Sequence, residues 1–201
     1  MGQNNVSDCY QMVLGETNRP LNSKGLRGQG STHGPRLKGW PRTITWQEFR
    51  AISTRPSGEN EDAQIETTVV QPNRVSIVQE QGRLRLGNYE GTLQIVRNNS
   101  WVVATHKTEK LLEHEQGHFD ITGLCARDLM KALGNLRADT AKELQQEVTR
   151  LYEAYDAWGD KLSEQYDEET NRSRNEAAQR GWNARIRTAI QQGTSLGTLP
   201  P

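Results

Sequence analysis

Hydrophobic and polar residues follow two different periods along the chain, and the period changes near residue 107. Between Thr43 and Val103, short β-branched runs with partial alternation are separated by turn pairs such as Pro72-Asn73 and Gly87-Asn88. A period of two predicts strands, and the short turns between the runs favour antiparallel neighbours. The runs are IETTVV, RVSIVQ, RLRLG, GTLQIV and SWVVAT. The sequence therefore predicts a small antiparallel sheet here.

From about residue 107, hydrophobic residues recur every three or four positions, which predicts amphipathic helices. The first helix covers about 107–134 and ends at Gly134. Two further helices are expected over about 137–158 and 160–191, with a hinge near Gly159. A sheet followed by helices is an α+β arrangement.

The first 42 residues lack sustained periodicity and are rich in Gly, Asn, Ser, Arg and Pro. This composition predicts an irregular arm or a pro-segment-like extension over 1–42. We expect one folded domain over 43–192 and a flexible tail over 193–201.

Composition limits the classes of partner. The 25 basic and 25 acidic residues cancel, so the chain has no overall attraction for nucleic acid or for an anionic membrane. No apolar run of about 18 residues is present, and the first residues do not form a signal peptide. A mean hydropathy of -0.86 predicts a modest core. The two cysteines, Cys9 and Cys125, do not form a disulfide framework or a Cys-rich zinc site.

The strongest chemical signal is HEQGH, from His114 to His118, inside the first predicted helix. Residues four apart lie on one face of a helix, so both imidazoles can reach one metal ion. Glu115 then lies beside the metal, where a carboxylate can act as general base and general acid on a zinc-activated water. The alternative is a solvated helix face with two surface histidines.

A catalytic zinc requires a third protein ligand, and the sequence near the motif supplies none. Metzincins have a third His six residues after the second, but that position is Leu124 here, so this chain is not a metzincin. His106 lies two turns before His114 along the predicted helix, too far to complete the site, and His33 lies in the irregular arm.

The third ligand is therefore expected to be a carboxylate from a later helix, as where two His and one acidic residue hold zinc. Asp167 is the first choice, followed by Glu168 or Glu169, although acidic runs commonly form a solvated face. Tyr166 could donate its hydroxyl to an oxyanion or could be a packing residue. Asp120 could orient a ligand His or could simply be exposed.

The two cysteines allow narrower hypotheses. Cys125 is expected to be a small buried residue. Cys9, in the arm, could reach the zinc and block it, because thiolates bind zinc well.

Several segments together resemble a bacterial family of secreted zinc-dependent proteases of unknown substrate. They are TWQEF at 45–49, SWV at 100–102, LLEHEQGHFDI at 111–121 and YDEETNRSRNEAAQRGW at 166–182. The resemblance spans about 43–190 and implies a zincin-like peptidase domain that is exported to the periplasm or the medium. It also matches Gln179 and Trp182, which it implies are packing residues or residues that orient a ligand.

One position departs from the family pattern Tyr-Asp-x-x-Thr-x-His, because Arg172 stands in place of the His. If that His were the third ligand, the site would be incomplete. If the Asp is the ligand, Asp167 keeps the site whole and Arg172 could stabilise an oxyanion. The second interpretation is preferred.

The sequence thus predicts a zinc peptidase with Glu115, Tyr166 and Arg172 in catalytic roles and His114, His118 and Asp167 as metal ligands. Its expected partner is a peptide or protein substrate, without nucleic acid or membrane insertion. The polar arm would also suit a larger assembly. The rival hypothesis is a degenerate zincin-like binding or cargo protein, with a structural or absent metal.

Overall fold

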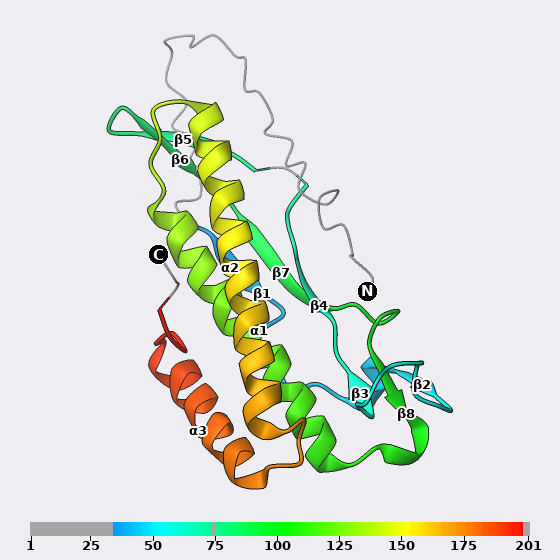
Figure 1. Cartoon of the computed structure of the whole chain (residues 1–201). Coiled ribbons are helices and arrows are strands. Elements are labelled where there is room, and N and C mark those ends of the chain that lie inside the picture. The colour runs from blue at the N-terminus through cyan, green and yellow to red at the C-terminus, as the bar shows by residue number, and fades with distance from the viewer. Residues whose placement is uncertain (1–33, 74, 199–201) are drawn as a thin grey trace.

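The computed structural model describes residues 34–73 and 75–198, where short strands lie beside a set of three helices (Figure 1). The strands are β1 (Arg36–Lys38), β2 (Arg50–Ile52), β3 (Ala63–Gln64), β4 (Thr67–Val70), β5 (Ile77–Glu80), β6 (Arg83–Leu86), β7 (Glu90–Ile95) and β8 (Trp101–Val103). The helices are α1 (Glu109–Asn135), α2 (Ala141–Thr170) and α3 (Glu176–Gln192), with 3-10 turns η2 (Trp46–Glu48) and η3 (Ala104–His106). The predicted mixture of a strand region and a later helical region is confirmed.

The strands form three small sheets, which corrects the prediction of one antiparallel sheet. Their orders are β1-β7-β4, β2-β8-β3 and β5-β6. β1 pairs in parallel with β7, and β2 pairs in parallel with β8. Alternation within a strand specifies its buried face but not its partner, so these parallel pairings could not be anticipated. β1 also lies inside the segment 1–42 expected to be irregular.

The helices begin at capping residues that the sequence provides. The side chain of Thr108 accepts a hydrogen bond from the backbone N–H of Leu111 at the start of α1. Thr140 and Glu143 form a reciprocal capping box at the start of α2. These caps satisfy backbone N–H groups that have no partner within the helix, and they fix where each helix begins.

The expected hinge near Gly159 is wrong, because α2 continues through this position to Thr170. A single glycine costs a helix about 1 kcal/mol, which a packed hydrophobic face can offset. That face includes Leu144, Val148 and Leu162, all buried. The break between helices lies at Asn171, where the backbone turns into the left-handed region with a φ of 48°.

Three hydrophobic clusters hold these elements together. The first joins β5 and β6 to the C-terminal part of α1 and the N-terminal half of α2. The second joins the three helices to one another. The third joins β3, β7 and β8 to the first half of α1. α1 contributes to all three, since Leu133, Leu124 and Phe119 are each at most 1% exposed. α1 is therefore the central element of the molecule.

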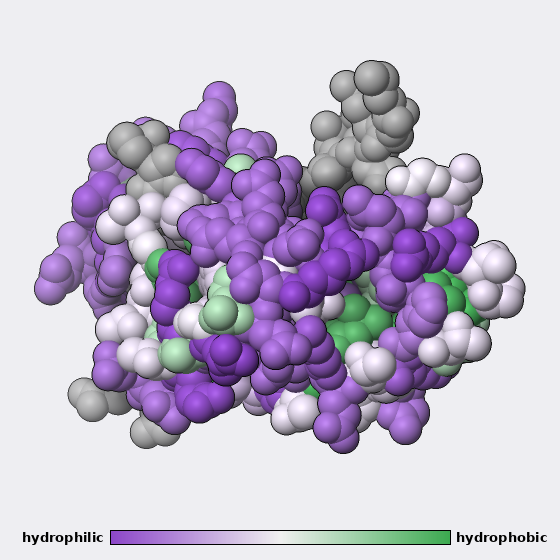
Figure 2. Space-filling view, turned by 60° about the horizontal axis from the view of Figure 1, so that its bottom comes forward, coloured by the Kyte–Doolittle hydropathy of each residue, from purple (hydrophilic) through white to green (hydrophobic). Residues whose placement is uncertain are grey.

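The face at the lower end of Figure 1 is mainly hydrophilic, with small hydrophobic patches between the polar side chains (Figure 2). Among the described residues, no helix combines the length and apolarity that crossing a membrane requires. Burial raises the pKa of the Cys125 thiol to about 12, so this cysteine is a protonated packing residue, as expected. Cys9 lies outside the described residues.

Candidate metal centre

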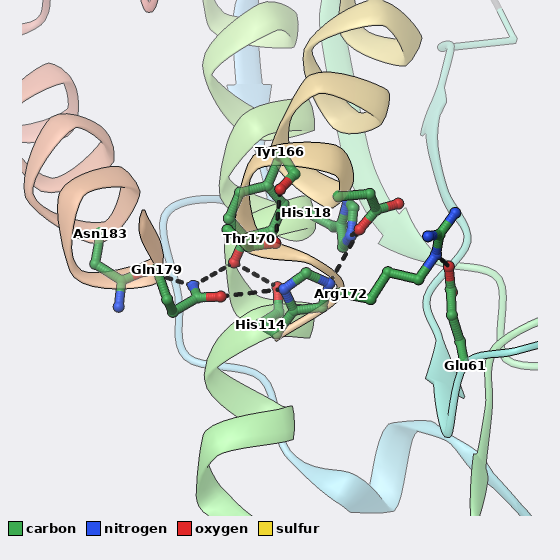
Figure 3. Close-up of polar contacts among 9 residues, drawn as sticks. Glu61, His114, His118, Tyr166, Thr170, Arg172, Gln179 and Asn183 are labelled. Atoms are coloured by element: carbon green, nitrogen blue, oxygen red, sulfur yellow. Dashed lines mark hydrogen bonds and ion pairs between the residues drawn. The ribbon is translucent and has the colours of Figure 1, made fainter. Parts of the chain in front are cut away.

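His114 and His118 lie one turn apart on α1 (Figure 3), and Asp167 lies near the end of α2. Oδ1 of Asp167 is 3.1 Å from Nε2 of His114 and 2.9 Å from Nε2 of His118. One ligand atom from each residue lies within 4.8 Å of the others, so the three could hold a metal ion. The predicted donor set is therefore assembled, and its members come from two antiparallel helices.

Tyr166 fixes the orientation of both imidazoles. Its ring stacks on that of His114 with centroids 4.7 Å apart and an interplanar angle of 15°. It also meets His118 edge to face at 4.9 Å. A β-carbon on Gly117 would overlap the Tyr166 hydroxyl, so the glycine of HEQGH is what allows this close approach.

The expected role of Tyr166 as an oxyanion donor requires correction. Its side chain is fully buried, and its hydroxyl donates to the backbone carbonyl of His114 at 3.1 Å. The same oxygen accepts a hydrogen bond from Nε2 of Gln179. Because the Tyr166 hydroxyl both donates and accepts a hydrogen bond inside the core, Tyr166 packs against the histidines and orients them.

Gln179, on α3, orients the first histidine. Its Oε1 lies 3.2 Å from Nδ1 of His114 and accepts a hydrogen bond when that nitrogen carries the proton. Its Nε2 donates to Oδ1 of Asn183 at 2.9 Å. An acceptor on Nδ1 leaves Nε2 of His114 as the metal-binding nitrogen, as is usual for ligand histidines.

Glu115 is buried beside the donor set and carries an oxygen without a partner. It is 2% exposed, and Oε2 makes no hydrogen bond within the described part of the chain. Burial raises the pKa of Glu115 well above its ordinary value, and the charges of Glu61 and Asp167 raise it further, whereas a backbone hydrogen bond at Ile65 lowers it. An unsatisfied buried carboxylate oxygen is costly and points to a function.

The donor set fits a divalent metal ion such as zinc. Two imidazole nitrogens and one carboxylate oxygen are a common zinc combination. Ligands at about 2.0–2.1 Å from a tetrahedral zinc lie about 3.3–3.4 Å apart, close to the two contacts of Asp167. Glu115 directly follows His114 on α1, and its carboxyl is close enough to Asp167 for the charge of Asp167 to raise its pKa.

A cleft of about 290 Å³ opens onto the site, between the loop before β3 and the turn after α2. Its lining includes His114 and Glu115 from α1, Arg172 from the turn and Glu61 from the loop. Nε of Arg172 donates to Oε1 of Glu61 at 2.5 Å (Figure 3). Arg172 therefore lies at the cleft, which is a requirement for a residue that stabilises an oxyanion there. Its Nε is engaged in an ion pair with Glu61.

The backbone of the turn after α2 is strained. Asn171, Arg172 and Ser173 have φ values of 48°, 49° and 70°, a region that favours glycine. The backbone N–H of Arg172 also donates to the carbonyl of Asp167 at 3.0 Å. Such strain is typical of functional segments, and here it places Arg172 at the cleft and closes the helix that carries Asp167.

Several other expected residues lie elsewhere. Asp120 does not orient a ligand His, because it accepts hydrogen bonds from Trp40 at 2.8 Å and Gln116 at 3.0 Å. Glu169 accepts a hydrogen bond from Trp182 at 2.8 Å and lies outside the donor set.

His106 was expected on the first helix, but it lies in η3, where its Nδ1 is 2.5 Å from Oδ1 of Asp62. Glu168 is exposed and is not part of the donor set, and Leu124 is buried in the core. His33 lies outside the described residues.

Glu61 is the functional candidate that the sequence did not indicate. It lies in the polar run GENEDAQ, where no period or spacing distinguishes it from its neighbours. Its proximity to Glu115 arises only because β3 is placed along α1 by tertiary packing. Gln179, in contrast, could be found through the resemblance, which includes it.

Comparison with known proteins gives a family but no activity. Searches among curated proteins and among solved structures gave no match. A family model described as a bacterial protein of unknown function (DUF922) matches residues 31–175, more than two thirds of the chain. The match covers the HEQGH segment and Asp167 and ends just before α3. The chain therefore belongs to this bacterial family of unknown function.

Proposed function

We propose that this protein is a zinc-dependent peptidase, with His114, His118 and Asp167 as the zinc ligands. The observation that carries the proposal is the buried, unpartnered oxygen of Glu115, the residue that directly follows His114 of this donor set. When bound there, zinc would supply a Lewis acid that lowers the pKa of a water ligand toward about 7.

Glu115 is the proton carrier in this proposal. Its raised pKa brings its proton affinity closer to that of the water it must deprotonate, and it can then give the proton to the leaving amine. Glu61 repels the charged form of Glu115, which supports this role. Tyr166 and Gln179 hold the histidine rings in place.

Arg172 can stabilise negative charge at the cleft. Its Nε donates a hydrogen bond to Glu61, and within the described part of the chain its two Nη nitrogens donate none. A guanidinium beside the reacting carbonyl would favour the charged transition state. The zincin-like character of the domain, a peptide or protein as substrate, and export to the periplasm or the medium are parts of the same proposal and rest on the family resemblance.

The metal is tested by elemental analysis of the full chain dialysed at neutral pH. We expect about one zinc per chain and a higher melting temperature on zinc addition, because a ligand that binds only the folded state stabilises it. His118→Ala and Asp167→Asn should lose both effects. A chain without zinc and without a thermal shift would favour the rival, a non-catalytic binding or cargo protein.

Catalysis is tested by hydrolysis of fluorescein-labelled casein with matched variants of α1. Glu115→Gln should keep zinc and lose at least about a hundredfold in rate, because the proton carrier is removed. Glu113→Gln is the control, since Glu113 is exposed on the same helix turn. Wild-type hydrolysis by a zinc-loaded Glu115→Gln protein would refute the mechanism.

A further inference from the structure

A second cavity, larger than the cleft above, lies between β4 and the middle of α2. It has a volume of about 650 Å³ and is lined by residues 67–73, by α2 and by one side of α1. Thr122 and Ser163 line it, and each lies one helical turn from a proposed metal ligand, His118 and Asp167 respectively. The groove therefore begins beside the metal centre and extends away from it.

The β4 wall is an unpaired strand edge. β4 pairs only with β7 among the described strands and forms the edge of its sheet. The carbonyl of Glu66 accepts a hydrogen bond from Val96 on the β7 side. Alternate residues of a strand direct their backbone groups to opposite edges, so Thr67 and Val69 present N–H and C=O groups at the edge of β4 opposite β7. An extended polypeptide can satisfy such groups by adding a strand.

The groove offers both apolar contact and negative charge. Val70, on its rim, is 43% exposed, the one large hydrophobic side chain so exposed within the described ranges. Asp156 and Asp160 line the α2 wall, and no Lys, Arg or His is among the described lining residues. Within these residues, neither carboxylate has a cation within ion-pair distance. Lys161, their neighbour on α2, lies over Trp158 instead.

We propose that this groove binds an extended polypeptide segment with apolar and basic side chains, which pairs with β4 and directs a Lys or Arg to Asp156 and Asp160. The free edge supplies sequence-independent hydrogen bonds, Val70 supplies apolar contact, and the two carboxylates supply the preference for cations. That this segment is a substrate rests on the proposed function, whereas its binding to the groove does not.

The test measures binding by fluorescence anisotropy to the full chain in EDTA, where no zinc-dependent hydrolysis occurs. The probe is the fluorescein-labelled peptide Gly-Val-Lys-Val-Arg-Val-Lys-Val-Gly, compared with a peptide that has Glu in place of each Lys and Arg. We expect the basic peptide to bind and the acidic peptide to bind at least about tenfold more weakly, because like charges across an interface are unfavourable. Equal affinities, or no binding of the basic peptide, would overturn the proposal.

Paired variants locate the site. Asp156→Asn/Asp160→Asn should weaken the basic peptide about five- to tenfold, as expected for two exposed charge pairs. Glu147→Gln/Glu153→Gln is the control, because it removes the same charge from α2 outside the groove lining. An equal loss in both pairs would mean that overall charge, and not the groove, attracts the peptide.

Backbone methylation tests strand addition without changing the protein. Two versions of the basic peptide carry N-methyl groups on alternate residues. In the first version the methyl groups lie along one edge of the peptide strand, and in the second they lie along the other edge. Only the set that faces β4 should abolish binding, since the other set faces solvent. Two equally tolerated sets would exclude pairing with β4. Peptide binding without any casein hydrolysis would leave this inference standing and contradict the proposed activity.

Discussion

Single residues on α1 determine how closely aromatic side chains approach the helix. Gly117 admits the ring of Tyr166, and Gly123 admits the indole of Trp40, which would overlap a β-carbon at either position. These contacts join α2 and the chain before η2 to the same helix. The sequence indicated the histidines of HEQGH by their spacing, but it gave no sign that the glycine between them is a packing requirement.

Gly117→Ala should therefore destabilise the protein by about 1–3 kcal/mol, because the new methyl group must displace a buried ring. Urea unfolding followed by tryptophan fluorescence measures the change. Gly181→Ala is the matched control, since a β-carbon at Gly181 on α3 meets open space. It should stabilise by up to about 1 kcal/mol through helix propensity alone. A loss in both variants would contradict the packing role of Gly117.

Glu115 should make the stability of the metal-free protein depend on pH. Burial, with the charges of Glu61 and Asp167, raises its pKa, so the folded state keeps a proton that the unfolded chain releases above about pH 4.5. The folded state is therefore progressively penalised as the pH rises from 4.5 toward the raised pKa. Below 4.5 both states are protonated and the penalty is absent.

Glu115→Gln removes this penalty, so in EDTA its urea midpoint should exceed that of the wild type at pH 7 and match it below pH 4.5. Glu113→Gln, at an exposed position, should follow the wild type throughout. A wild-type midpoint at least as high as that of Glu115→Gln at pH 7 would contradict a raised pKa of Glu115 in the folded state.

At the scale of elements, periodicity predicted the helices and the five later strands, because each buries one regular face. Periodicity could not predict that β7 and β8 have β1 and β2 as parallel partners. β1 and β2 are each three residues long and have no repeating pattern to detect. The expected hinge failed for a related reason. Gly159 was read as a local breaker, whereas the packing of α2 on α1 keeps the helix continuous.

Gly159→Ala distinguishes a continuous helix from a hinge. A β-carbon at Gly159 would lie 3.9 Å from Cβ and Sγ of Cys125, an ordinary contact. The variant should gain about 0.5–1 kcal/mol in unfolding free energy, measured with urea, because alanine favours the helix. A destabilised variant with weaker zinc binding would instead support the hinge.

At the scale of the whole molecule, the donor set requires all three helices. α1 and α2 carry the donors, and α3 supplies Gln179 to His114 and Trp182 to Glu169. The sequence could predict Asp167 because two helices separated by a turn can bring residues about 50 apart together. It could not predict the cleft wall formed by Glu61, which depends on a loop with no regular pattern.

Gln179→Ala should lower zinc affinity about tenfold or more, because removing the hydrogen-bond partner of a ligand histidine typically has this effect. Competition with a fluorescent zinc chelator measures it. Asn183→Ala is the control: it removes a hydrogen bond to the same amide group and leaves the contact with His114. Equal affinities for Gln179→Ala and wild type would show that α3 only packs on the site.

The two parallel strand pairs also have a consequence for the order of folding. β1 and β2 each pair with a strand that follows more than 50 residues later, so β1 cannot pair until the chain has been made through β7, and β2 cannot pair until it has been made through β8. α1 and α2 are separated by a short connection, so their contacts beside that connection are close in sequence and form faster, whereas His118 and Asp167 are 49 residues apart. We therefore expect the α1–α2 hairpin to form first beside its connection, and the three donors at its open end to meet about as late as the two parallel strand pairs.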